Sequence, residues 1–155
     1  VVWYYQELAR RIGEDRMRVY LRQLEYGNRN MGGGLDRFWL RGDLRISADE
    51  QVEFLRRFYS GELGISRRAT EIVREIMVLR ETASCRLSGK TGTAEVTPTR
   101  DLAWLVGFVE CGDDVAFFAL NMEGENVWED WPPQQRTDLV LRLLEQLGIV
   151  VSQTT

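Results

Sequence analysis

The stretch SGKTGTAEV, residues 88–96, contains two overlapping triplets that predict unrelated chemistry. Gly-Lys-Thr, residues 89–91, is part of the loop with which many nucleotide-binding proteins hold phosphate groups. Lys-Thr-Gly, residues 90–92, is typical of a strand whose cationic edge faces a serine that becomes acylated. The residues around the triplets decide which chemistry the sequence supports.

The phosphate-binding interpretation fails on its flanking residues. Such a loop has the pattern G-x-x-x-x-G-K-[ST] and lies between a strand and a helix. Ser84 stands where the first glycine should be. After the triplet, Val96 and Pro98 continue a strand and then a turn, not a helix. The sequence therefore argues against nucleotide binding.

The Lys-Thr-Gly interpretation gives each residue a task. The ammonium group of Lys90 would raise the local positive potential and assist proton movement during acylation. The hydroxyl group of Thr91 can donate to a substrate carboxylate, and Gly92 leaves room for an acylamide group along the strand. The backbone N–H of Thr93 can point into an oxyanion hole. Alone, a three-residue match is weak, because most such matches are strands with an exposed lysine.

Composition predicts one globular domain and excludes several function classes. Of 155 residues, 44% are hydrophobic and 28% are charged, which is ordinary for a folded domain with a core. The net charge is −4 and no basic stripe with interleaved aromatic residues is present, which argues against nucleic-acid binding. No apolar run approaches the roughly 18–20 residues of a membrane span. With no histidine and no zinc-type cysteine spacing, we expect no metal site.

Hydrophobic periodicity predicts helices in the first part of the chain. Apolar residues recur at helical spacing over residues 3–12, 17–24, 52–59 and 67–79. Ser47 and Glu50 have the spacing of a capping box in front of the third helix. The Gly- and Asn-rich residues 25–45 predict a long structured loop. Residues 1–82 are thus expected to form a mostly helical subdomain.

The second part of the chain predicts an antiparallel sheet and a closing helix. Residues 83–122 are expected to form three strands joined by turns, with Trp104 and Phe108 in the core. A helix is expected over residues 132–148, packing on the sheet, with Pro133 in its first turn. Its predicted buried stripe is Leu139, Leu143, Leu144 and Leu147. The expected fold class is α+β in a single domain.

The two cysteines lie where a hairpin would bring them together. A hairpin centred on Pro98 places Cys85 opposite Cys111. A disulfide between them is plausible in an oxidising compartment, and two reduced strand cysteines are the alternative.

Two further motifs precede the Lys-Thr-Gly triplet. They are YGN, formed by Tyr26, Gly27 and Asn28, and FWL at residues 38–40. Together with GGGLDRFWLRGDLRISADEQVEFL, these motifs resemble those of class D (oxacillinase-type) serine β-lactamases, over essentially the whole chain. The resemblance implies the serine β-lactamase/penicillin-binding-protein transpeptidase-like fold, with an antiparallel sheet beside a helical subdomain.

The resemblance assigns roles to residues outside the triplet. Trp39 matches the tryptophan that donates to a carboxylated lysine, and Leu40 matches the apolar residue beside it. Val1 and Val2 would be the second and third residues of the S-x-V motif, with Val2 packing on that lysine. Arg136, with Arg142 as the alternative, matches the arginine that binds the substrate carboxylate, a task suited to a planar guanidinium. Thr93 occupies a position that is often aromatic in this family.

The resemblance also predicts what this chain lacks. The S-x-x-K motif, which carries the nucleophilic serine and the carboxylated lysine, is absent, and so is the serine of S-x-V. The N-terminal portion of the fold is therefore expected to be absent from this chain. A segment of the same protein carrying S-x-x-K is the expected partner, and without it a large apolar face would be uncovered.

Several candidate residues also have a purely structural interpretation. Tyr26 and Asn28 can close a helix and a turn. Arg136 can be a solvated helix residue. Trp39 alone would more often be packing than a catalytic contact, an expectation that the FWL context reverses. The tryptophans near the last helix, Trp128 and Trp131, can line a substrate-facing rim or pin that helix, which burial statistics favour.

The resulting hypothesis is hydrolysis of β-lactam antibiotics through an acyl-serine intermediate in a periplasmic or secreted protein. It needs no metal or cofactor beyond the CO2 that carboxylates the lysine of the absent segment. A second copy of the chain, as a homodimer, is a further candidate partner. The alternatives are a β-lactam sensor domain that acylates without turnover, against which Val2 argues mildly, a penicillin-binding D,D-peptidase, and an inactive fragment.

Overall fold

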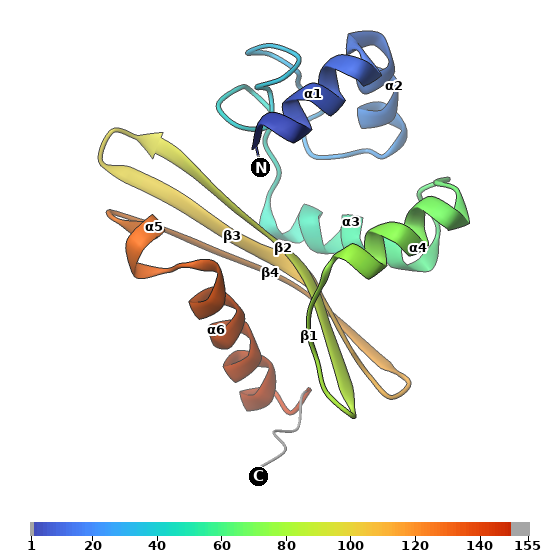
Figure 1. Ribbon diagram of the computed structural model, residues 1–155, viewed down its shortest axis with the longest axis vertical. Helices are drawn as coiled ribbons and strands as arrows, with labels where there is room; N and C mark the ends of the chain where they lie inside the picture. The colour runs from blue at the N-terminus through green and yellow to red at the C-terminus, as the bar shows by residue number, and fades with distance from the viewer. Residues whose placement is uncertain (1, 150–155) are drawn as a thin grey trace.

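A computed structural model describes residues 2–149 as an α+β arrangement (Figure 1). Its elements, in chain order, are α1 Val2–Ile12, α2 Glu14–Gln23, α3 Ala48–Ser60, α4 Arg67–Ile76, β1 Val78–Glu81, β2 Cys85–Thr97, β3 Arg100–Cys111, β4 Asp114–Gly124, α5 Val127–Asp130 and α6 Pro133–Gln146. None of the helices among these residues is long and apolar enough to cross a membrane.

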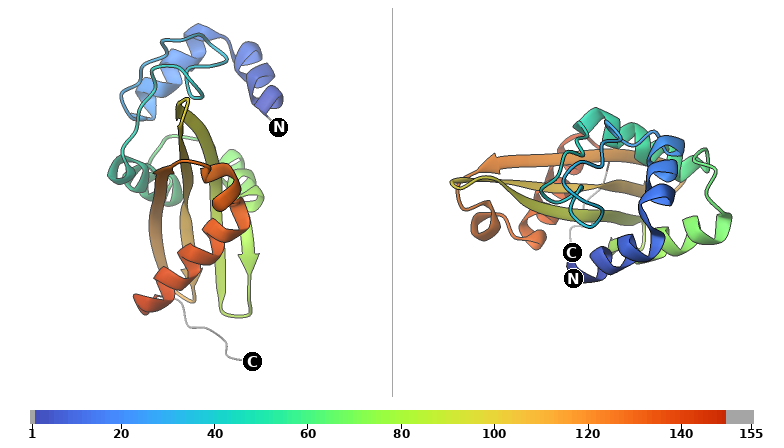
Figure 2. Two further views of the ribbon diagram at one scale, coloured as in Figure 1. Left: turned by 90° about the vertical axis from the view of Figure 1, so that its left-hand side faces the viewer. Right: turned by 90° about the horizontal axis from the view of Figure 1, so that it is seen from above.

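The four strands form one antiparallel sheet in the order β1-β2-β3-β4. Successive side chains of a strand point to opposite faces, so each strand contributes to two cores. On one face, Leu87, Leu105 and Val109 pack against Val140 and Leu144 of α6. The sheet is therefore a middle layer, and α6 covers one of its faces (Figures 1 and 2).

The opposite face of the sheet packs against α3 and the segment that follows it. Phe108 of β3 lies in a cluster with Phe58 of α3 and Leu63, and all three side chains are buried. The ring of Tyr59 meets the ring of Phe108 edge to face, with centroids 5.2 Å apart. α3 itself begins as predicted, because the Ser47 hydroxyl accepts from the Glu50 N–H and the Ser47 N–H donates to the Glu50 carboxylate.

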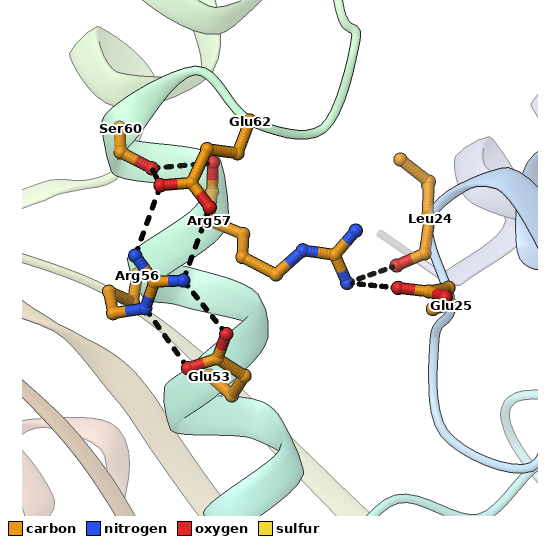
Figure 3. A network of polar contacts seen from close by, with 7 residues as sticks. All are labelled: Leu24, Glu25, Glu53, Arg56, Arg57, Ser60 and Glu62. Atoms are coloured by element: carbon orange, nitrogen blue, oxygen red, sulfur yellow. Dashed lines mark hydrogen bonds and ion pairs between the residues drawn. The ribbon is translucent and has the colours of Figure 1, made fainter.

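The N-terminal lobe, defined as α1, α2 and residues 24–46, lies beyond one end of the sheet (Figure 2). A small core of Leu21, Met31 and Phe38 holds its loop. Arg57 of α3 ties the lobe to the sheet domain, since its guanidinium group lies 2.9 Å from the Glu25 carboxylate (Figure 3).

Two sequence predictions need correction. The helix expected to run to Leu79 ends at Ile76, and Val78–Glu81 forms a fourth strand that pairs with β2. On α6 the predicted stripe is wrong in part, since Leu143 and Leu147 are 42% and 72% exposed. The face toward the sheet carries Arg136, Thr137, Val140 and Leu144. The face of α6 that packs on the sheet is thus less apolar than the predicted leucine stripe. It includes the buried side chain of Arg136.

The predicted cysteine register is confirmed. Cys85 is the partner of Cys111 in the β2–β3 pairing, and the structure joins them by a disulfide. The bridge closes the end of the β2–β3 hairpin opposite to its turn.

Candidate active site

The Lys-Thr-Gly triplet lies on a strand edge that is open within residues 2–149. β1 pairs with β2 only over Arg86–Ser88, and Gly89 N–H donates to the carbonyl of Met77 on that side. Backbone N–H groups alternate along a strand, so those of Thr91 and Thr93 point to the same edge as that of Gly89. Thr93 therefore offers its N–H at the edge, where the prediction of an oxyanion donor needs it.

Lys90 stands over this open edge. Its side chain is exposed, and its Nζ donates to the carbonyl of Thr91 at 2.7 Å. It is the only lysine in the sequence, in which every other cationic side chain is an arginine. An ammonium group is a compact point charge with three donors, whereas a guanidinium group is a planar fork, so Lys90 is chemically distinct from the other cations.

The two residues after Lys90 leave the edge accessible. Thr91 is half-buried, and its hydroxyl group makes no hydrogen bond to the residues that the structure describes. Gly92 is exposed, and a Cβ built there would meet nothing closer than the Cβ of Trp104 at 3.8 Å. The space over Gly92 is thus open, as the prediction of an acylamide lying along the strand requires.

Arg136 reaches the triplet from the other face of the sheet. It is only 1% exposed, so the alternative of a solvated helix residue is wrong, whereas Arg142 is exposed on the same helix. Its guanidinium group donates to the carbonyls of Trp131, Gly92 and Trp104 and to Thr93 Oγ1, at 2.6, 2.9, 3.2 and 2.8 Å. These contacts hold α6 against β2 and β3.

The charge of Arg136 is not neutralised within residues 2–149. All four of its acceptors are uncharged, and no carboxylate in this part of the chain forms an ion pair with it. Burial lowers the pKa of the guanidinium group, which nevertheless stays protonated at any ordinary pH. A buried cation with neutral partners favours the approach of an anion.

The loop with Trp39 and Leu40 belongs to the N-terminal lobe. Phe38 is buried, and Trp39 is half-buried with its ring edge to face against Phe38, centroids 4.9 Å apart. The indole N–H of Trp39 donates to no residue in the described part of the chain. Arg41 joins the loop to β2 through the Glu95 carboxylate at 3.2 Å. The half-buried Leu40 lies between these two contacts.

The YGN motif fixes both ends of this loop. Asn28 accepts from the N–H of Arg45 at 3.0 Å and donates to the Asp43 carbonyl at 2.8 Å. Gly27 has φ +49°, and a Cβ there would lie 2.1 Å from the Arg45 carbonyl oxygen. Tyr26 donates its hydroxyl to Gln51 of α3 at 2.8 Å, and burial raises the pKa of Tyr26. The motif is therefore structural, and it positions the segment that carries Trp39.

Other predicted residues lie outside this arrangement. Val2, at the start of α1, is 51% exposed, and its packing on a carboxylated lysine stays a prediction; Val1 lies outside the described residues. Trp128 is 58% exposed and does not pin α6. Trp131 contributes its backbone carbonyl to Arg136. Within residues 2–149 no cluster of His, Cys, Asp and Glu could hold a metal ion.

The side-chain contact of Thr93 was not predicted from the sequence. The motif assigned a role only to its backbone N–H, yet its hydroxyl is the one side-chain atom among the acceptors of Arg136 described above. The available signal was its position two residues after Thr91, which places both hydroxyl groups on one face of the strand. The carbonyl contacts of Trp104 and Trp131 carry no sequence signal at all, because every residue has a carbonyl.

Comparisons with known proteins agree with this geometry. The model of the penicillin-binding protein transpeptidase domain matches residues 1–145. The chain is 40% identical over 149 residues to β-lactamase OXA-5 of Pseudomonas aeruginosa, covering 95% of this chain and 55% of that protein.

Solved structures give the same result. The class D β-lactamase YbXI from Nostoc superimposes with a TM-score of 0.87 at 38% identity, covering 96% of this chain and 62% of that one. The C-terminal domain of the Bacillus licheniformis BlaR penicillin-receptor gives a TM-score of 0.87 at 35% identity, covering 97% and 59%. The chain thus spans between half and two thirds of the length of these relatives, and the predicted fold and resemblance are confirmed.

Proposed function

Because the chain belongs to the penicillin-binding protein transpeptidase domain family, we propose that it forms the substrate-binding wall of a serine enzyme that hydrolyses β-lactam antibiotics. The observation that carries the proposal is the open edge of β2. There the exposed Lys90 and the outward N–H of Thr93 lie on a strand that is backed by the buried, uncompensated charge of Arg136. The relatives named as class D β-lactamases support the same reaction.

In the proposed reaction, a serine attacks the β-lactam carbonyl and the amide C–N bond of the ring breaks, leaving an acyl-serine that water then hydrolyses. The serine and a carboxylated lysine come from a segment carrying S-x-x-K, outside this chain. Lys90 assists proton transfer during acylation. The N–H of Thr93 stabilises the oxyanion, and Thr91 and Arg136 bind the substrate carboxylate.

The Trp39 indole supports the proposed base. Its N–H has no acceptor in the described part of the chain, so it is available to donate to a carboxylated lysine. CO2 would supply the carboxyl group that turns this lysine into a general base. Leu40 and Val2 would exclude water from it, since an apolar surrounding strengthens the hydrogen bond from Trp39.

We further propose a periplasmic or secreted location, which the Cys85–Cys111 disulfide supports because such bridges persist in oxidising compartments. A homodimer is proposed only as one way to cover the exposed apolar side chains of α1.

The second candidate is a β-lactam sensor domain that is acylated but does not turn over. The likeness to the BlaR penicillin-receptor favours it, because its TM-score of 0.87 equals that of the Nostoc β-lactamase. A D,D-peptidase is supported by the family model alone, and the YGN and FWL motifs argue against it.

The test is hydrolysis of benzylpenicillin by the full-length protein with added bicarbonate, with intact-mass measurement alongside. Sustained turnover supports the β-lactamase proposal, and a stable adduct without turnover supports the sensor. The Lys90→Met variant should lose acylation at least about 100-fold, as expected for a general acid–base group. The proposal would be overturned if the unmodified protein showed no turnover and formed no adduct.

A further inference from the structure

The N-terminal lobe, which carries the loop with Trp39, meets the strands of the sheet at one polar contact. The guanidinium group of Arg41 donates from Nη2 to the carboxylate of Glu95 on β2 at 3.2 Å. Within residues 2–149, this ion pair is the only hydrogen bond or salt bridge between the lobe and any strand. The other polar contacts of the lobe with the sheet domain go to α3 or to the segment that follows α3. Among the polar contacts, the ion pair alone thus fixes the loop relative to the strand of Lys90.

We infer that the ion pair of Arg41 with Glu95 positions Trp39 on the carboxylated lysine of the S-x-x-K segment and thereby keeps that lysine carboxylated. The inference rests on the proposed function, which places this lysine outside the chain and uses it as the base. It adds two positioning residues that act through Trp39 and to which that function gives no part.

The carboxylated lysine depends on the placement of a hydrogen-bond donor. Carboxylation joins the neutral amine of a lysine to CO2, forms one N–C bond and releases one proton. The carbamate that results is an anion, and it loses CO2 again unless hydrogen bonds stabilise it. The indole N–H of Trp39 has no acceptor among the described residues and is free to donate to it. Because a hydrogen bond weakens steeply with distance and angle, a small displacement of Trp39 destabilises the carbamate.

Arg41 can act on Trp39 because the two residues belong to one tight turn. The N–H groups of Arg41 and Gly42 both donate to the carbonyl of Arg37, each at 3.1 Å. Gly42 packs directly against Phe38, since a Cβ built on Gly42 would lie 2.4 Å from the Phe38 Cα. Trp39 lies inside this turn, so a displacement of the Arg41 backbone also moves the indole group of Trp39.

Glu95 is a suitable anchor for the turn because it lies on the same strand as Lys90. β2 pairs with β3 residue by residue from Cys85 to Glu95, and the register shift of this pairing lies beyond Glu95. Lys90 and Glu95 therefore belong to one continuous, fully paired stretch of strand. The ion pair consequently fixes the turn with Trp39 relative to Lys90.

The ion pair is suited to adjusting a position and not to holding a fold. The side chain of Arg41 is 73% exposed and that of Glu95 is 49% exposed. Exposed ion pairs contribute little to folding, and they weaken as the salt concentration rises. Removing either residue should therefore leave the lobe folded and change only how firmly Trp39 is placed.

The experiment measures carboxylation directly, by carbon NMR of the full-length protein titrated with isotope-labelled bicarbonate. The signal of interest is the carbamate carbon that disappears when the lysine of S-x-x-K is replaced by alanine. Arg41→Ala and Glu95→Ala should each need about 2- to 5-fold more bicarbonate for half-saturation, the range that an exposed ion pair can supply. Added salt should reproduce this loss in the unmodified protein and change the two variants little, because salt screens the pair.

Two further variants serve as controls. The double variant Arg41→Glu with Glu95→Arg exchanges the two charges and should recover the affinity for CO2 that Arg41→Glu alone loses. Arg100→Ala removes another exposed ion pair, that of Arg100 with Glu123 at 3.2 Å, and should leave half-saturation unchanged. The inference would be overturned by equal half-saturation in Arg41→Ala and the unmodified protein, by an equal loss in Arg100→Ala, or by the absence of the carbamate signal.

Hydrolysis of benzylpenicillin, measured alongside, separates this inference from the proposed function. Turnover by Arg41→Ala should fall at low bicarbonate and recover at saturating bicarbonate, because the lysine is then carboxylated again. The expected differences in carbamate formation without turnover in the unmodified protein would support the inference while the proposed hydrolysis fails. Turnover in the unmodified protein with the same half-saturation in every variant would support the proposed function and overturn the inference.

Discussion

The sheet with α6 and the N-terminal lobe differ in how they are held together. In the sheet, Leu105 and Phe108 are fully buried between helices on both faces. In the lobe, α1 meets its loop through exposed polar groups, such as Arg10 with Asp36 at 2.7 Å, while Trp3 is 70% exposed. Exposed ion pairs contribute little stability, and apolar burial contributes most of it. The strand edge with Lys90 and the buried Arg136 is therefore preorganised by this chain, whereas the loop with Trp39 is held by weaker interactions.

The largest expected effect is on the free energy of unfolding, which one substitution in each region compares directly. Phe108→Ala should lower the free energy of unfolding of the 155-residue chain by about 3–5 kcal/mol, because it leaves a cavity in a packed core. Trp3→Ala should change it by no more than about 0.5 kcal/mol, because the side chain is exposed in this chain. Urea unfolding followed by circular dichroism measures both. Comparable losses in the two variants would show that α1 is already well packed and would break the comparison.

The sequence predicts the pairing of β2 with β3 better than it predicts where each element begins or ends and which face of a helix is buried. Period-two patterns and turn residues around Pro98 were sufficient for the hairpin and for the pairing of Cys85 with Cys111. β1 was missed because Leu79 continues the apolar spacing of the preceding helix. The buried face of α6 was missed because periodicity selects the leucines, while the helix buries Arg136 for its polar contacts.

The disulfide offers a test within the sheet. Cys85 and Cys111 are 26 positions apart in the chain, a separation for which the loop-closure estimate of stabilisation is about 3.5 kcal/mol. Replacing both cysteines by alanine should lower the free energy of unfolding by about that amount. Adding a thiol reductant should reproduce the loss in the unmodified chain and leave the double variant unaffected. Two thiols that alkylate without any reductant would contradict the bridge.

The candidate site was predictable wherever a motif places a backbone group or a charge. The roles of Lys90 and of the N–H of Thr93 follow from the Lys-Thr-Gly triplet, the residue after it and the alternation of groups along a strand. The role of Asn28 did not follow, because its contacts reach Asp43 and Arg45 across a loop whose path no local pattern predicts. Long-range contacts of this kind depend on the tertiary structure and not on spacing.

A smaller effect is expected in the lobe at Asn28. Asn28→Ala removes the acceptor of the Arg45 N–H and the donor to the Asp43 carbonyl, and should cost about 2 kcal/mol. Hydrogen exchange should show the Arg45 amide losing protection while amides of β3 keep theirs. Asn121→Ala, at an exposed position of β4, is the matched control and should change neither. If the β3 amides lose protection equally, the lobe and the sheet unfold as one unit.

The smallest expected effect is a pH dependence at the junction of the two regions. Burial raises the pKa of Tyr26, whose hydroxyl group donates to Gln51 of α3. Its phenolate is therefore favoured in the unfolded chain, and the stabilisation, complete below about pH 10, is lost as pH rises through the folded-state pKa. Burial, together with Glu110, also raises the pKa of Tyr59 on the sheet side, so each region carries one such tyrosine.

Urea unfolding between about pH 9 and 11 should show the free energy of unfolding falling, and falling less steeply in Tyr26→Phe and in Tyr59→Phe. Tyr20→Phe, at a residue 51% exposed, should match the unmodified chain. If the free energy of unfolding falls less steeply with pH in Tyr59→Phe but not in Tyr26→Phe, the junction at Tyr26 has opened before the sheet unfolds. The lobe would then be the separately unfolding region, because a group that titrates in an already open segment no longer contributes to the main transition.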